Sequence, residues 1–145
     1  MIDALRPRPT VLVVDDEALV AMLVADTLAD AGYRVVCAPD GRAAPTVPGS
    51  AASPDAAVVN LRLADGLDGR DVIRALRKRR PDLPAVMITG YDALAPEADL
   101  RGLGGPTVRL HKPFDCDELL DHLAGLLARP SPRRAPRRRM SDMAA

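Results

Sequence analysis

The chain of 145 residues has the length of one domain, which leaves little room for a second full catalytic domain. Hydrophobic residues make up 48 % and aromatic residues 2 %, so the core must be aliphatic, and the rings on which single-stranded nucleic acids stack are scarce. The net charge is zero, but the charges are unevenly distributed. Residues 129–145 hold six Arg and one Asp and carry a net charge of +5, whereas residues 1–128 carry −5. Only the tail is therefore suited to bind polyanions, and weakly.

The first half of the chain predicts a strand, a helix and a strand after an N-terminal extension of residues 1–9. Residues 10–14 form an apolar run of the length of a buried strand. Apolar residues then recur at helical spacing up to Gly32, which is typical of a helix end. Residues 34–38 predict a second strand. Prolines interrupt residues 42–54, so we expect at most one turn of helix there.

The second half of the chain continues the alternation of strands and helices. Residues 56–60 predict a third strand. A helical face follows a polar loop and ends before Pro81, and the cations of residues 77–80 on its last turn suit the helix dipole. The remaining elements are expected at residues 83–88 (strand), 93–103 (short helix), 106–110 (strand) and 115–128 (helix). Proline and arginine predict a disordered tail at residues 129–145, so the folded domain should span residues 10–128.

Residues 1–9 lack the apolar stretch of a signal peptide, and no run approaches the length of a membrane span. We therefore expect a cytoplasmic, reduced protein in which Cys37 and Cys116 are buried thiols. Two cysteines without CxxC spacing and two histidines do not make a zinc site.

Five strands alternating with helical segments predict an α/β fold, a parallel sheet with helices on both faces. Ligands of such sheets bind beyond the carboxyl ends of the strands, so the residues that follow the strands are the candidates for a site. These residues are Asp15 and Asp16, Asn60, Thr89 and Lys112.

Their chemistry suits a phosphoryl group. Asp15 and Asp16 repel each other unless a cation lies near, and Mg²⁺ takes one or two carboxylates while leaving room for phosphate oxygens. Thr89 would donate a hydrogen bond, and Lys112 would supply a counter-charge. Taken singly, the acids could be a helix cap, Thr89 a turn residue and Lys112 a loop residue. Their joint placement at one edge of the sheet favours a site.

At this point the chain resembles the receiver domain of bacterial response regulators. The resemblance covers about residues 10–128 and rests on four motifs in order: VLVVDDEALVAMLVADTLADAGYRV (11–35), PDAAVVNLRLADGLDGRDVIRALR (54–77), PAVMITGYD (84–92) and HKPFD (111–115). It implies a flavodoxin-like (βα)5 fold with strand order 2-1-3-4-5, here with a degraded second helix and a short fourth one. It also implies two-component or phosphorelay signalling downstream of a histidine kinase.

The resemblance also assigns roles. Asp15 and Asp16 match the acidic pair that holds Mg²⁺, with the backbone carbonyl of Arg62 as a further metal ligand. Thr89 matches the hydroxyl and Lys112 the lysine of the phosphoryl pocket. The phosphoacceptor position, however, is Asn60. An amide is a poor nucleophile and carries no charge, so we predict no phosphorylation at this position and weak or absent Mg²⁺ binding.

Two further departures concern the switch of the family. In the family, an aromatic side chain three residues before the lysine usually changes rotamer as a switch, and here this position is Arg109. Tyr91 could take over as the aromatic switch, and a packing role for Tyr91 also stays open. The output face would be formed by the fourth helix, the fifth strand and the last helix.

We therefore expect a single-domain receiver-like protein that is not an enzyme. It would act through contacts with a histidine kinase or another signalling protein, or through a homodimer. The chain offers no room for a DNA-binding output domain, and nucleic-acid binding is expected at most from the tail. Two alternatives stay open: a receiver in which Asp65 or Asp68 accepts phosphate, and a Mg²⁺-dependent phosphohydrolase with Asp15 as nucleophile, although that class typically carries a DxD pattern.

Overall fold

The computed structural model describes residues 8–38, 54–63, 68–90, 100 and 102–128. Within these ranges the elements follow the order β1 (Thr10–Val14), α1 (Ala18–Asp30), β2 (Arg34–Ala38), β3 (Ala56–Asn60), α2 (Gly69–Arg77), β4 (Ala85–Thr89), β5 (Thr107–His111) and α3 (Cys116–Leu127). The expectations for the interrupted second helix, the short fourth helix and the disordered tail fall on residues 42–53, 91–99 and 129–145. These lie outside the described residues, as do Asp65 and Tyr91.

The five strands form one parallel sheet in the order β2-β1-β3-β4-β5, which confirms the topology implied by the resemblance. The short apolar sequences of β3 and β4 are buried along their whole length, as expected for strands that are covered on both faces. Because all strands are parallel, their carboxyl ends meet at one edge of the sheet, where the candidate residues stand.

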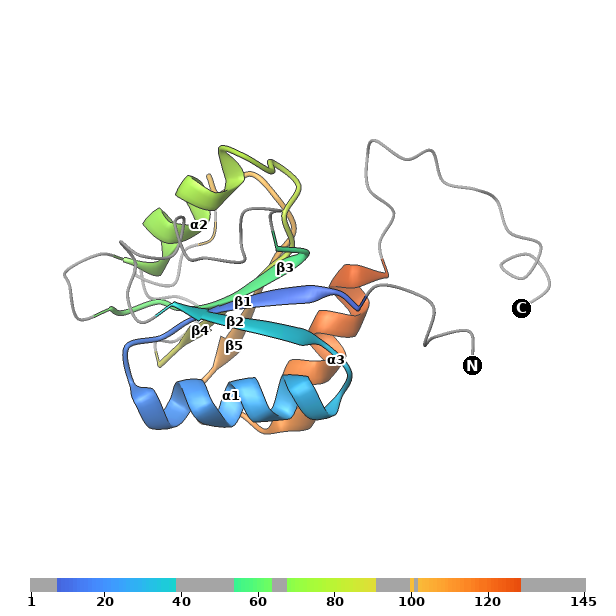
Figure 1. The fold of residues 1–145 in the computed structure, drawn as a ribbon. Coiled ribbons are helices and arrows are strands. Elements are labelled where there is room, and N and C mark those ends of the chain that lie inside the picture. Colours follow the sequence, from blue (N-terminus) through green and yellow to red (C-terminus); the bar gives the residue numbers. More distant parts are fainter. Residues whose placement is uncertain (1–7, 39–53, 64–67, 91–99, 101, 129–145) are drawn as a thin grey trace, which may run out of the picture.

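Alternate residues of each strand face opposite sides of the sheet, and each side has its own aliphatic cluster. Helices α1 and α3 cover one face and α2 covers the other (Figure 1). On the α1 and α3 side, Val11, Val13 and Val58 pack with Leu28 and Leu119. The other cluster joins strand residues to three side chains of α2, Val72, Ile73 and Leu76. The aliphatic core and the helices on both faces were thus predicted correctly.

The helix ends are fixed by local hydrogen bonds. Asp68 caps α2 by accepting from the amide of Arg70 at 2.8 Å. Asp115 and Glu118 form a capping box at the start of α3, a motif that satisfies two otherwise unpaired backbone amides. Helix α2 ends at Arg77, three residues earlier than the sequence suggested.

The side chain of Arg77 has a tertiary role that its interpretation as a helix-end cation did not predict. It is only 6 % exposed and donates to the carbonyl oxygens of Leu83, Leu103 and Pro106 and to the hydroxyl of Thr107, with donor–acceptor distances of 2.7–3.0 Å. Burial lowers the pKa of this guanidinium below its ordinary value. Arg77 thus ties the end of α2 to the segments that lead into β4 and β5.

The expectation of buried thiols is wrong. Cys37 is exposed on β2, which is an edge strand of the sheet, and Cys116 is partly exposed at the start of α3. Among the described residues no strand lies beyond β2 to cover Cys37, and the Cys116 Sγ lies 3.2 Å from the hydroxyl of Thr27 on α1. Among the described residues, no helix is both long and apolar enough to cross a membrane.

Candidate functional site

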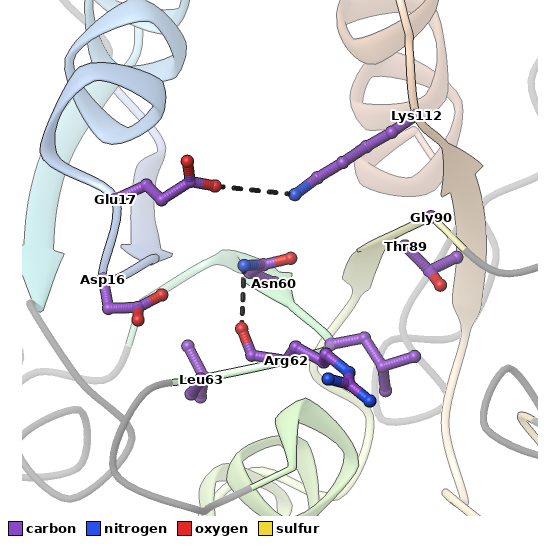
Figure 2. Close-up of a pocket in the computed structure, with 9 residues that line it drawn as sticks. Asp16, Glu17, Asn60, Arg62, Leu63, Thr89, Gly90 and Lys112 are labelled. Carbon is purple, nitrogen blue, oxygen red and sulfur yellow. Dashed lines mark hydrogen bonds and ion pairs between the residues drawn. The ribbon is translucent and has the colours of Figure 1, made fainter.

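A pocket of about 630 Å³ lies at the carboxyl ends of the strands. It brings together most of the residues that the sequence singled out, from β1, β3, β4 and the segment after β5 (Figure 2). The lining residues are Asp16, Glu17, Asn60, Leu61, Arg62, Leu63, Thr89, Gly90 and Lys112.

The two adjacent aspartates differ in environment. Asp16 is exposed and lines the pocket, whereas Asp15 is 5 % exposed and is not among the lining residues. The Asp15 carboxylate accepts a hydrogen bond from the amide of Glu17 at 2.9 Å. Burial raises the pKa of Asp15 above 3.8, and the Glu17 amide together with the charge of Lys112 offsets only part of that effect. The buried placement of Asp15 does not favour its use as a phosphohydrolase nucleophile.

Asn60 ends β3 and lies between the acidic residues and Lys112, where Figure 2 shows its amide at the centre of the pocket. It is 6 % exposed, and its Nδ2 donates to the backbone carbonyl oxygen of Arg62 at 2.8 Å. This carbonyl is the one that the resemblance assigns to the metal. In this structure an N–H donor of Asn60 points at the oxygen that a cation would otherwise contact.

Thr89 and Lys112 approach from the other side. Thr89 is buried at the end of β4, and the backbone amide of Lys112 donates to its carbonyl oxygen at 2.7 Å. The Lys112 Nζ lies 3.9 Å from the Glu17 carboxylate (Figure 2). With a neutral residue at position 60, the sequence allows Lys112 to pair with Asp15 or Asp16. The pair forms with Glu17 instead, because Asp15 is turned into the protein and bonded to a backbone amide.

The sequence analysis did not single out the lining residues Glu17, Leu61, Leu63 and Gly90, nor Gly69 at the start of α2. Glu17 was visible only as the third acid of the run Asp15-Asp16-Glu17. Gly69 opens α2 directly beneath the pocket, and its amide donates to the carbonyl oxygen of Leu61 at 2.7 Å. A Cβ at position 69 would lie 2.5 Å from the Asn60 carbonyl oxygen, so only glycine fits there. The Asp-Gly pair at the start of the helix was the available signal.

The loop between β3 and α2 is closed by an antiparallel bridge between Arg62 and Asp68. Burial by itself would raise the pKa of Asp68, but hydrogen bonds and charge from Arg70 outweigh it, so that this pKa falls below 3.8. Asp68 is held by the amide and the guanidinium of Arg70 and does not line the pocket.

The donor set for Mg²⁺ is incomplete. Asp15, Asp16 and the Arg62 carbonyl are oxygen donors of the right kind, but one Asp15 oxygen and the Arg62 carbonyl already accept hydrogen bonds. Among the described residues, no group of three or more Asp, Glu, His or Cys side chains is arranged to hold a metal ion. Asp15 and Asp16 would offer Mg²⁺ two carboxylates, the usual number, but the Arg62 carbonyl already accepts a hydrogen bond from Asn60.

Of the two predicted switch residues, Arg109 lies on β5 and pairs with Met87 of β4. It is partly buried and not among the residues that line the pocket. Its neighbour Leu110 faces α1 and α3, so strand alternation directs Arg109 to the opposite face of the sheet.

Comparison with known proteins gives a consistent result. Residues 11–124 match the model of the response regulator receiver domain. The "Probable transcriptional regulatory protein TcrX" of Mycobacterium tuberculosis is 36 % identical over 121 residues, which cover 83 % of this chain and 50 % of that protein. The "Acid tolerance regulatory protein ActR" of Rhizobium meliloti is 34 % identical over 134 residues, 92 % of this chain and 66 % of that one. The chain thus spans half to two thirds of these relatives.

Solved structures agree with this family. The chemotaxis protein CheY4 of Vibrio cholerae has a TM-score of 0.73 and 30 % identity, and the match covers 83 % of this chain and 99 % of that one. A response regulator receiver protein from Sinorhizobium medicae has a TM-score of 0.71 and 32 % identity, with 83 % and 94 % covered.

Proposed function

Because the chain belongs to the response regulator receiver domain family, and hence to two-component signalling, we propose that it is a receiver that is not phosphorylated at the usual position and signals by protein–protein contact. The observation that carries this proposal is the Asn60 amide at the centre of the pocket, bonded to the Arg62 carbonyl oxygen.

The chemistry of the amide supports the first part. Phosphoryl transfer to a receiver requires a carboxylate oxygen that attacks phosphorus and displaces the leaving group. The amide oxygen of Asn60 is uncharged and its lone pair is delocalised toward nitrogen, so it is a much weaker nucleophile. Proteins of this family are in general signalling proteins rather than enzymes, and the buried Asp15 gives a phosphohydrolase reading no support.

The contacts of Lys112 and Asn60 support a pocket that works without a phosphoryl group. With a neutral residue at position 60, Lys112 finds its counter-charge in Glu17, and the Asn60 amide satisfies the Arg62 carbonyl. The pocket is therefore balanced without a phosphoryl group. If Mg²⁺ binds, Asp15, Asp16 and the Arg62 carbonyl would hold it, and it would neutralise the acids. We propose that this binding is weak, because Asn60 removes one negative charge.

The partners follow from the family. Receiver domains interact with histidine kinases, and we propose that this chain contacts a kinase or another signalling protein, or a second copy of itself. The relative TcrX is named as a probable transcriptional regulatory protein, and the match to this chain covers half of its length. Cytoplasmic location stays a prediction.

The test is phosphorylation by a small phosphodonor. We expect the full chain to take up no hydroxylamine-sensitive phosphate from acetyl phosphate with Mg²⁺, as measured by intact-protein mass spectrometry. Asn60→Asp should become labelled, and it should bind Mg²⁺ about tenfold more tightly or better in calorimetry because a third carboxylate faces the cation.

Mapping the label separates the alternatives. Asp68→Asn in the wild-type background is the control for an alternative acceptor, and Asp65→Asn is a second one. Stoichiometric acyl phosphate on the wild-type chain that disappears in either variant would overturn the proposal. Failure of Asn60→Asp to accept phosphate, in a folded protein, would show that the pocket differs by more than one side chain.

A further inference from the structure

Helix α1 exposes a stripe of apolar side chains. Leu19, Met22 and Leu23 are 81 %, 59 % and 53 % exposed and are the large exposed hydrophobic residues among the described residues. Their spacing places them on one face of the helix, which continues one and two turns later with Asp26 and Asp30, both exposed. We call these five residues the α1 stripe. Clustered apolar exposure of this kind is typical of a binding surface.

The surroundings of the α1 stripe are acidic. Neither α1 nor α3, which lie side by side on one face of the sheet (Figure 1), contains a lysine or an arginine. Helix α3 adds the exposed acids Asp117, Glu118 and Asp121. The layer on the opposite face is basic, with three arginines in α2 and three more cations at residues 78–80. A partner of the α1 stripe must therefore combine positive charge with apolar groups.

The chain itself contains such a segment. Residues 129–145 follow directly on the cap of α3 and carry six Arg and one Asp, together with Met140 and Met143. Arginine stems cover apolar surface while their heads pair with carboxylates, and methionine adapts to irregular apolar surfaces. Helix α1 is about 20 Å long, and 17 extended residues span up to about 56 Å, so the segment can reach the whole stripe.

We propose that residues 129–145 dock on the α1 stripe of their own chain, with arginines on Asp26 and Asp30 and apolar groups on Leu19, Met22 and Leu23. Tethering favours this occupant, because a short linker raises the local concentration to the millimolar range, so that weak contacts suffice. The basic α2 layer of a second copy is the competing occupant. Several of its cations are already engaged, since Arg74 pairs with Asp71 and Arg80 pairs with Asp55 and Asp82.

The experiment uses the full chain with ¹³C-methyl-labelled methionine. Met22 reports on the α1 stripe, and Met87, which is buried in the sheet, reports on the fold. In the tail-neutral variant, Arg133, Arg134, Arg137, Arg138 and Arg139 are each changed to Gln. We expect the Met22 methyl resonance to differ between wild type and this variant while Met87 stays in place. Asp26→Asn with Asp30→Asn should move Met22 in the same way.

Salt and dilution complete the test. From about 10 mM to about 1 M NaCl the Debye length falls from about 30 Å to about 3 Å, so the wild-type Met22 signal should move to its tail-neutral position. The control Lys78→Gln with Arg79→Gln removes exposed cations from the other layer and should leave Met22 unchanged. Identical Met22 signals in wild type and the tail-neutral variant would overturn the proposal. A wild-type shift lost on dilution would also overturn it, because the occupant would then be another copy.

Discussion

Replacing Arg77 by Met is the sharpest test of how this fold is held together. Methionine keeps the length and the apolar stem of the side chain but removes all five hydrogen-bond donors. The structure shows five donor–acceptor contacts from this guanidinium, to three carbonyl oxygens and one hydroxyl, in a side chain that is 6 % exposed. The acceptors lie 6, 26, 29 and 30 residues along the chain, so the contacts are tertiary.

The magnitude follows from what is left behind. A buried acceptor that loses its donor costs about 1–3 kcal/mol, and several such groups are created at once. Removing a desolvated charge returns part of this, since well-packed apolar replacements of buried ions are often tolerated. We expect a net loss of about 3–5 kcal/mol in the free energy of unfolding, a large share of the roughly 5–15 kcal/mol typical of a domain. The melting temperature should fall by about 10 °C or more.

Urea unfolding followed by far-UV circular dichroism measures this loss, and Arg74→Met is the matched control. Arg74 lies on the same helix, is about half exposed and pairs with Asp71. Its loss should cost less than about 0.5 kcal/mol. Arg77→Lys keeps the charge with a single donor group and should fall between the two. If Arg77→Met lies within about 1 kcal/mol of the Arg74 control, the view of Arg77 as a tertiary anchor is refuted.

Three other changes probe the pocket. Gly69→Ala places a Cβ 2.5 Å from the Asn60 carbonyl oxygen, so it should destabilise by about 1–3 kcal/mol and shift the Asn60 side-chain amide resonances in NMR spectra. The pKa of Asp68 is lowered, so its pair with Arg70 stabilises above pH 3.8 and this contribution disappears as the pH falls through the lower folded-state pKa. Asp68→Asn should therefore lose about 1 kcal/mol at pH 7 and progressively less as the pH falls through the folded-state pKa, in urea titrations over this range. Glu17→Gln breaks an exposed pair and should change the melting temperature by less than about 2 °C in calorimetry.

Much of this protein was readable from the sequence, because the features concerned are local. Apolar runs of strand length and helical spacing depend on neighbours within a few residues, and they located the five strands and the three described helices to within a few residues. Parallel strands bring their carboxyl ends to one edge, so five residues were predicted to meet: Asp15, Asp16, Asn60, Thr89 and Lys112. All of them except Asp15 line one pocket. The departure at Asn60 needed only the identity of one residue.

Tertiary structure decided which partner each polar group meets. The sequence indicated Arg77 only as a cation at a helix end, whereas the structure surrounds it with backbone carbonyls up to 29 residues away. Lys112 turned to Glu17 because Asp15 is buried, and Gly69 proved indispensable because helix α2 starts against the backbone of Asn60. Periodicity reports on which side of an element faces the core. The contacts of one side chain depend on how separate elements approach each other, and that is fixed only when the whole core packs.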